Sequence, residues 1–302
     1  MPTAPFALVR YVLYGVLMGG ADVIPGVSGG TMALIVGIYE RLVGALSSAV
    51  SFGLAVLRLD LDAARRHWTA VPWGLIVPLL AGIGGAIIGG AAVIPPLMEA
   101  YPAPMRGLFF GLVAASLLIP ARRIERVTGL RVGIGVACAA GAFFLTGLPA
   151  LAVSDPGLIR VFCSAMVAIC AMILPGVSGA FLLEALGIYA ATLEALNTLD
   201  WAYVLTFCAG AAVGLGAFAT LLDALLTHRH DATMAALVGL ITGALRALWP
   251  YGGADRMLRG PEAGEPILSV VLLALIGFGS VCLLLVWSTP DAETEEPTVS
   301  SS

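Results

Sequence analysis

The sequence contains no lysine, and charged residues of both signs make up only 11% of its 302 residues. Soluble globular domains are about a quarter charged. The hydrophobic share is 60% and the mean hydropathy is +1.01, both far above the values of such domains. Because a chain in lipid must pair its own backbone polar groups, and the apolar runs here are long, helices are the expected spanning elements. We therefore exclude a soluble globule and predict an all-α polytopic membrane protein.

Paired cysteines and clustered histidines are also missing. The five cysteines stand singly in apolar segments without Cys-x-x-Cys spacing, so we expect buried free thiols and neither a zinc site nor a disulfide framework. His67, His228 and His230 fall in predicted loops and do not form a metal-ligand set. No charged region precedes a short apolar core and cleavage site, so no removable targeting segment is expected. We predict no metal, no cofactor and no nucleic-acid partner.

Long runs without a formal charge are abundant. They are long enough for the roughly 20 residues of a spanning helix, and they cover residues 71–98, 132–154, 161–183, 201–222 and 266–290. We assign residues 1–288 to a single membrane domain. Residues 289–302 are polar and acidic, and we expect a disordered tail there.

One seven-residue stretch occurs twice, at an offset of 150 residues. Residues 24–30 read IPGVSGG and residues 174–180 read LPGVSGA, and Gly-Ile-Tyr follows at 37–39 and again at 187–189. Proline removes a backbone donor and glycine permits dihedrals that other residues resist, so each copy is expected to break a helix. In lipid, a broken backbone is tolerated where protein or a water-filled cavity satisfies it. Paired breaks therefore indicate the centre of function.

The membrane domain is predicted to be duplicated. Repeat one covers about residues 6–150 and repeat two about 158–288, each a broken or re-entrant helical hairpin followed by three transmembrane helices. Residues 31–57 are expected to continue as one helix after the first motif, and the hairpin legs either span the bilayer or turn back within it. In both cases each half crosses the membrane an odd number of times, so the second copy is expected to be inverted. The later spans are expected near 72–95, 103–120, 131–150, 201–226, 232–249 and 266–288.

Arginine placement predicts the orientation, because cytoplasmic loops are enriched in basic residues. With the N-terminus inside, the outer loops hold only Arg256 and Arg259. The inner loops then hold eight arginines, namely Arg58, Arg65, Arg66, Arg122, Arg123, Arg126, Arg131 and Arg229. We therefore predict that both termini are cytoplasmic, that the first motif is reached from inside and the second from outside, and that the two meet near the midplane.

The motif chemistry indicates an anion site. A helix that begins just after PGVSGG presents unpaired N–H groups and the positive end of its dipole, and glycine-permitted turns can form an anion-binding nest. In a single motif, proline and glycine more often only kink a packed helix. Duplication at the centre of both halves favours binding instead. The predicted substrate-binding residues are Pro25, Gly26, Ser28, Gly29, Gly30, Thr31, Pro175, Gly176, Ser178 and Gly179.

Three charged residues near the motifs are candidates for coupling or head-group contact, since ionisable groups at membrane depth are costly. Asp22 matches Met172 of the other copy and is either an N-cap or vestibule residue or a proton- or cation-coupling group. Glu184 matches Leu34 and is expected to face the cavity, with a proton-linked role. Arg41 is expected in a paired interface at a helix end, with a contact to a phosphate from the inner leaflet as the alternative.

Residues 19–31 (GGADVIPGVSGGT), continuing to residues 37–40 (GIYE), resemble the bacterial PopT family, formerly classed as a domain of unknown function. Residues 173–179 (ILPGVSG) strengthen the resemblance, which covers roughly residues 8–288. The resemblance implies a flippase for polyprenyl phosphate in the cytoplasmic membrane. It would return undecaprenyl phosphate, the lipid carrier of cell-wall precursors, from the outer to the inner leaflet. The identity of the lipid comes from the resemblance alone, and oligomeric state and coupling stay open.

Two other functions use similar features. The membrane phosphatases for undecaprenyl pyrophosphate also contain duplicated re-entrant segments, with a Pro-Gly-x-Ser-Arg-Ser motif. Here Gly29 and Gly179 stand in place of that arginine, and neither half has a Glu-x-x-x-Glu pair, so phosphoryl transfer lacks its electrostatic parts. A transporter of a small inorganic anion would use the same helix starts without a lateral opening for a prenyl chain. Both stay open as alternatives.

Overall fold

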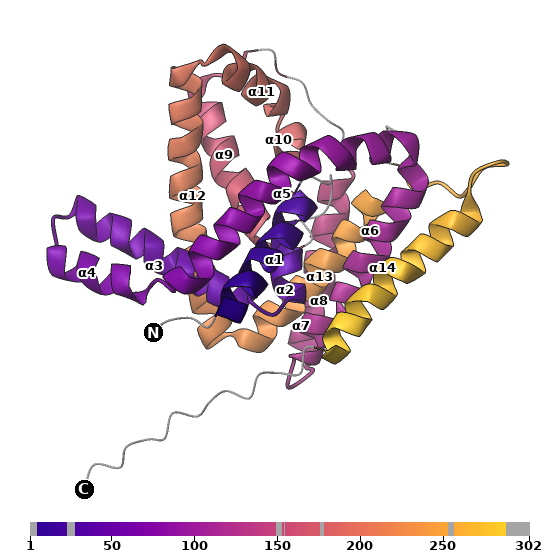
Figure 1. Ribbon diagram of the computed structural model, residues 1–302, viewed down its shortest axis with the longest axis horizontal. Helices are drawn as coiled ribbons and strands as arrows, with labels where there is room; N and C mark the ends of the chain where they lie inside the picture. The colour runs from indigo at the N-terminus through magenta and orange to yellow at the C-terminus, as the bar shows by residue number, and fades with distance from the viewer. Residues whose placement is uncertain are drawn as a thin grey trace, which may run out of the picture.

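A computed structural model describes residues 5–22, 28–148, 153, 155–175, 178–252 and 257–287. Within these ranges the regular secondary structure is helical throughout (Figure 1). The first half contains α1 (Pro5–Asp22), α2 (Gly29–Ile35), α3 (Tyr39–Leu57), α4 (Leu61–Ala70), α5 (Trp73–Ala100), α6 (Pro102–Ser116), α7 (Leu118–Arg122) and α8 (Gly129–Thr146). The second half contains α9 (Leu158–Ile173), α10 (Gly179–Ala185), α11 (Tyr189–Thr198), α12 (Trp201–His228), α13 (His230–Ala244), the 3-10 helix η1 (Leu245–Leu248) and α14 (Ile267–Trp287).

Several predicted features lie outside the described residues. They are Pro25, Gly26 and Gly176 of the predicted binding set, Arg256 of the predicted outer loops, and the acidic tail at 289–302.

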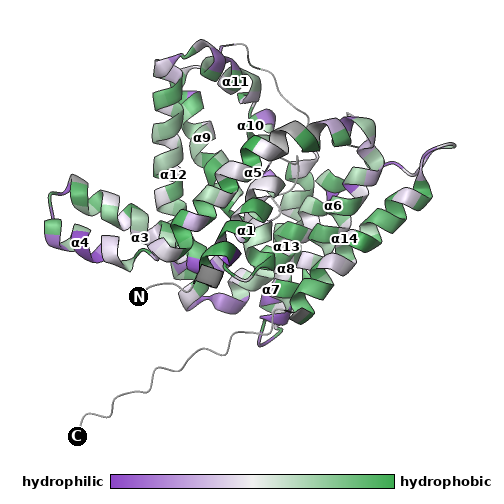
Figure 2. Ribbon diagram, viewed as in Figure 1, coloured by the Kyte–Doolittle hydropathy of each residue, from purple (hydrophilic) through white to green (hydrophobic). Residues whose placement is uncertain are grey.

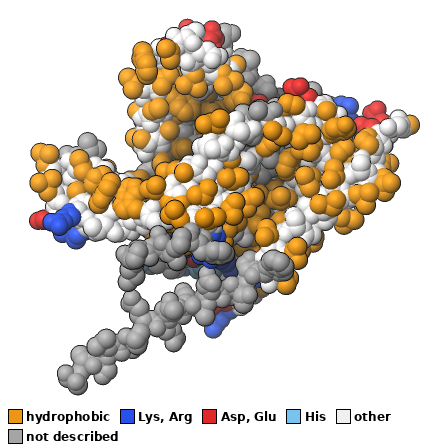
Figure 3. Space-filling model, viewed as in Figure 1, with side chains coloured by type: hydrophobic (Ala, Val, Ile, Leu, Met, Phe, Trp, Pro, Cys, Tyr) orange, Lys and Arg blue, Asp and Glu red, His pale blue; other side chains and the backbone are white. Residues whose placement is uncertain are grey.

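The helices are long and apolar enough to cross a membrane several times. Five segments qualify on their own, namely Pro102–Arg122, Gly129–Thr146, Trp201–His228, His230–Leu248 and Ile267–Val286. Two bent pairs also qualify, α4 with the start of α5 (67°) and α10 with α11 (104°), which raises the number to seven. Hydrophobic residues cover most helices in Figure 2, and in Figure 3 the charged side chains gather at the edges of the visible face. The chain is a multi-pass helical membrane protein, as its composition predicts.

The two halves repeat one series of helices. α2 and α10 each have 7 residues, α5 and α12 each have 28, and α6 and α13 each have 15. A short helical turn, α7 or η1, follows the last of these in each half. α1 packs along α5 as α9 packs along α12. α4 is an addition of the first half, where it packs on the longer α3 and forms the hairpin seen at the left of Figure 1.

The last helix of each half packs against the other half. α8 lies along α13, and α14 lies along α6. Glycines allow these close approaches, because a Cβ on Gly239 would lie 2.1 Å from the carbonyl oxygen of Gly135, and one on Gly111 would lie 1.9 Å from that of Ala274. The halves are therefore interlocked. The element order and the packing are compatible with a duplicated domain, and the duplication and the opposite orientation of the two copies stay predictions.

The repeated Gly-Ile-Tyr tripeptide ends a helix in both copies, so the expectation of one helix over residues 31–57 was wrong. Gly37 has φ +76° and Gly187 has φ +80°, a left-handed conformation that glycine adopts without a steric penalty. The Ile38 N–H donates to the carbonyl of Ala33 at 3.0 Å, as in a Schellman cap, and the equivalent bond recurs in the second copy. The break after α2 was not predicted because the hydrophobicity of a segment does not indicate which glycine adopts a positive φ.

The cysteines are free thiols, but none of them is buried. Cys163 and Cys208 are exposed, and Cys138, Cys170 and Cys282 are half-buried. The expectation of burial was wrong because helices in lipid can present thiols on their outer surfaces.

Candidate functional site

The first motif places Ser28 at the start of α2. Its backbone is extended and its Oγ accepts a hydrogen bond from the Gly30 N–H at 3.1 Å, which makes it the N-cap. Asp22, at the end of α1, accepts a second bond from the Gly29 N–H through Oδ1 at 2.7 Å. A carboxylate therefore already occupies one of the backbone donors that the sequence assigned to an anionic ligand.

The second motif repeats this local arrangement without the charge. Ser178 caps α10 through its Oγ. Met172 takes the place of Asp22, since a Cβ on Gly179 would lie 2.3 Å from the Met172 side chain, as one on Gly29 would lie 2.7 Å from the Asp22 carboxylate. The two copies thus share one geometry. They differ in the side chain that faces the glycine after the motif serine, which is the Asp22 carboxylate at Gly29 and the Met172 thioether at Gly179.

The two motifs lie against each other. The Ser28 Oγ is within hydrogen-bond distance of two carbonyl oxygens of the second copy, at 3.4 Å from Met172 and 3.3 Å from Leu174. A Cβ on Gly30 would lie 2.8 Å from the carbonyl oxygen of Ile173, so the backbones approach closely here. The single hydroxyl proton of Ser28 is therefore shared between two carbonyls at the end of α9, so a side chain of the other repeat pairs with backbone at this break.

A cavity of about 210 Å³ lies beside the two motif serines. Asp22, Ser28 and Ser178 supply its polar groups, and apolar side chains of α9 and α12 form most of the remaining wall. A phosphate group fits in such a volume, whereas a long prenyl chain does not. The described residues that line the cavity include no arginine or histidine, so any anion held there relies on hydroxyl and backbone donors.

The other described residues of the predicted set do not line this cavity. Gly30 and Thr31 are buried within α2, which is buried along its whole length. Glu184 is half-buried on α10, where its neighbour Leu183 lines the cavity instead. Arg41 is exposed and donates from Nη1 to the hydroxyl of Tyr11 at 3.3 Å. The structure therefore brings together Asp22, Ser28, Ser178 and Gly179 of the predicted set.

The apolar wall of the cavity was not predicted from the sequence. Phe207 and Ala211 of α12 line the cavity, as do three residues of α9, namely Ala165, Ala168 and Ile169. The α9 residues follow a helical spacing of three to four and end at Met172, so extending the helix back from the motif would have found them. The α12 residues carry no comparable signal.

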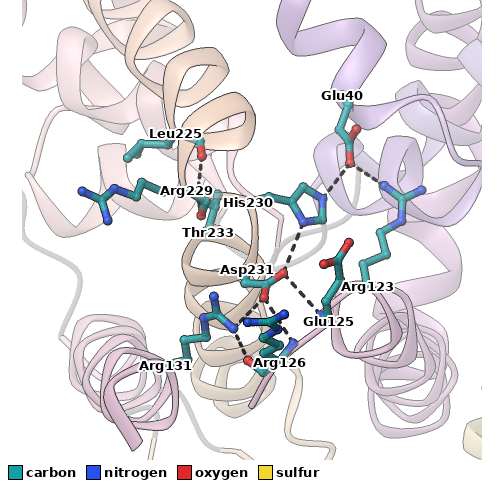
Figure 4. Close-up of polar contacts among 10 residues, drawn as sticks. All are labelled: Glu40, Arg123, Glu125, Arg126, Arg131, Leu225, Arg229, His230, Asp231 and Thr233. Atoms are coloured by element: carbon teal, nitrogen blue, oxygen red, sulfur yellow. Dashed lines mark hydrogen bonds and ion pairs between the residues drawn. The ribbon is translucent and has the colours of Figure 1, made fainter. Parts of the chain in front are cut away.

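A second polar cluster joins the two repeats at the start of α3 and the start of α13 (Figure 4). Arg123 pairs with Glu40 at 2.6 Å, and Arg131 pairs with Asp231 at 2.6 Å. His230 lies between them, with ring nitrogens 3.6 Å from a carboxylate oxygen of Glu40 and 3.6 Å from one of Asp231. Through the described part of the chain, no group of three or more His, Cys, Asp or Glu residues is placed to hold a metal ion.

The sequence of the chain was compared with those of known proteins. A family described as undecaprenyl phosphate translocase-like matches residues 18–263, a range that includes both motifs. A polyprenyl-phosphate transporter of Vibrio cholerae is 38% identical over 240 residues, which cover 79% of this chain and 77% of the relative. A polyprenyl-phosphate transporter of Staphylococcus aureus is 27% identical over 257 residues, which cover 79% and 85%. No solved structure matches significantly. The chain belongs to the undecaprenyl phosphate translocase-like family.

Proposed function

We propose that this protein is a flippase that returns undecaprenyl phosphate from the outer to the inner leaflet of the bacterial cytoplasmic membrane, for reuse in peptidoglycan synthesis. The observation that carries the proposal is the cavity at which the two PGVSG motifs meet, lined by Ser28 and Ser178. Family membership and the names of the two relatives, which describe transport of polyprenyl phosphate and no enzymatic reaction, support it.

The proposed head-group site is closer to the second motif. Both motif helices have only 7 residues, so they contribute backbone donors and little dipole. In the first copy the Asp22 carboxylate engages the Gly29 N–H. In the second copy Met172 replaces the carboxylate, so a phosphate meets no negative charge from that position. The Ser178 hydroxyl and the backbone around Gly179 are the proposed contacts, with Ser28 on the facing loop.

The prenyl chain is proposed to remain in lipid while the phosphate crosses between the motif loops, by alternating access. This follows from the size of the cavity, which admits a phosphate group only. With both termini in the cytoplasm, as arginine placement predicts, the second motif would receive the head group from the outer leaflet and the first would release it inward.

Asp22 is the proposed coupling group. Protonation would weaken its bond to the Gly29 N–H and so free a donor for the phosphate, which would link binding to a proton. Glu184 and Arg41 lie off the cavity, so their proposed contributions are to the stability of α10 and to the contact of α3 with α1.

Purified protein in liposomes tests the proposal against its two alternatives. Accelerated loss of undecaprenyl phosphate from the outer leaflet supports the flippase. Release of phosphate from undecaprenyl pyrophosphate would support a phosphatase, and uptake of inorganic phosphate without lipid transfer would support a small-anion transporter. The absence of arginine from the described cavity lining favours transfer over phosphoryl chemistry.

A further inference from the structure

A second amphipathic site lies on α8 and α13, away from the motif cavity. We propose that it binds a phospholipid with an anionic head group. The head group would lie in a polar cavity of about 470 Å³ at the starts of the two helices, and an acyl chain in an apolar groove of about 310 Å³ between them. Arg131 lines both the cavity and the groove, and no described residue of either lines the motif cavity. The site therefore goes beyond the proposed translocation path.

Asp231, one of the two carboxylates that line the polar cavity, is already compensated. The Asp231 carboxylate accepts from the N–H groups of Glu125 (3.3 Å) and Arg126 (3.2 Å) and pairs with the Arg131 guanidinium at 2.6 Å. The residues that line the cavity include two arginines, Arg131 and Arg229, and two carboxylates, Glu125 and Asp231. Because Arg131 is paired with Asp231, Arg229 is left as the arginine that can contact a phosphodiester.

Arg229 is the cation available to a ligand. It lines the polar cavity and is exposed, and across the described ranges of the chain it makes no ion pair. Figure 4 shows its side chain directed away from the cluster around Asp231, while its carbonyl accepts from Thr233. Basic pockets between transmembrane helices on the cytoplasmic side are characteristic binding places for anionic head groups.

The groove beside this cavity has the shape and chemistry for a hydrocarbon chain. Small residues, among them Gly135, Ala139 and Gly239, form its lining where the two backbones approach. Val132 and Val136 flank it and are 52% and 64% exposed. Arg131, fixed by Asp231, stands at the junction of cavity and groove. The polar cavity and the apolar groove therefore lie next to each other, as the head group and the acyl chain do in a lipid.

The length of the groove favours a phospholipid over the transported polyprenyl phosphate. From Val132 to Ala139 the groove follows α8 for about 10 Å at ~1.5 Å per residue. The hydrocarbon of one leaflet is about 15 Å deep, so an acyl chain matches this depth, whereas a polyprenyl chain far exceeds it. Separation from the motif cavity gives a second reason to assign a resident lipid.

Native mass spectrometry of the purified full chain tests the site, with phosphatidylglycerol and phosphatidylethanolamine offered together. The wild type is expected to retain phosphatidylglycerol preferentially. Arg229→Ala should lower its retention about fivefold, the effect of one interfacial arginine, and Val136→Trp should lower it by filling the groove. Arg66→Ala, an exposed arginine of α4, and Val213→Trp, at a 52% exposed position of α12, are the matched controls and should retain the lipid.

Equal retention of the two phospholipids by the wild type, or equal retention of phosphatidylglycerol by the Arg229 and Val136 variants and their controls, would overturn the proposal. Displacement of phosphatidylglycerol by equimolar undecaprenyl phosphate, with the same dependence on Arg229, would also overturn it and assign the site to the transported lipid. Since lipid retention is measured without transfer, failure here leaves the flippase proposal to its own assay.

Discussion

At the scale of single residues, Gly179 sets the room available in the motif cavity. It lines the cavity, and its nearest neighbour is the flexible Met172 side chain, 2.3 Å from an added Cβ. Gly179→Leu should therefore fill the cavity and lower leaflet transfer at least about tenfold, equal to ~1.4 kcal/mol of lost head-group binding. Gly141→Leu on α8, where an added Cβ meets no atom within 4 Å, is the control. Unchanged transfer by a folded Gly179 variant would contradict the site.

Asp22 is the residue at which charge and hydrogen bonding can be separated. Asp22→Asn keeps an oxygen for the Gly29 N–H but cannot take up a proton. If protonation of Asp22 drives transport, the wild type should respond to a pH gradient across the liposome and Asp22→Asn should not. The measurement is the transfer rate with and without the gradient. The same response in both proteins would restrict Asp22 to capping the first motif.

At the scale of the helix, the repeated Gly-Ile-Tyr turn is needed to end α2. Gly37 has φ +76°, and an added Cβ would meet no atom within 4 Å, so Gly37→Ala tests backbone strain alone. It should lower the free energy of unfolding by roughly 1–2 kcal/mol. Gly141→Ala, inside α8, should raise it by about 0.5–1 kcal/mol because alanine favours helix. Unfolding of detergent-solubilised protein compares them, and a shift of the same sign would contradict the cap.

The helices also show which parts of the fold could be predicted from the sequence. Proline and glycine chemistry located both motif breaks, and apolar runs located the spans, because these are local properties of the chain. The partners of α8 and α14 were not predictable, since apolar surfaces in lipid do not encode which helix they contact. The motif was enough to select Ser28, Ser178 and Asp22, which the structure places in the cavity lining. It did not show that the side chains of Glu184 and Arg41 are absent from that lining, because their positions depend on helix breaks that the apolar pattern does not reveal.

At the scale of the whole molecule, the helices divide into two kinds of pair. α1–α5 and α9–α12 each come from one half, and these pairs carry the motif helices. α6–α14 and α8–α13 each combine a helix from both halves, and they stand side by side in Figure 1. Glycines bring the backbones close in both kinds of pair, since an added Cβ on Gly82 would lie 2.1 Å from the carbonyl oxygen of Val12 and one on Gly111 would lie 1.9 Å from that of Ala274.

The most direct test is leaflet transfer of undecaprenyl phosphate in liposomes by the wild type and by the double variant Ser28→Ala/Ser178→Ala. Both serines line the motif cavity and cap the two short helices. The wild type should move the head group from the outer to the inner leaflet without releasing phosphate. The double variant should be slower by at least about tenfold, equal to ~1.4 kcal/mol of lost head-group binding. Transfer no faster than in protein-free liposomes, or undiminished transfer by the double variant, would contradict the account.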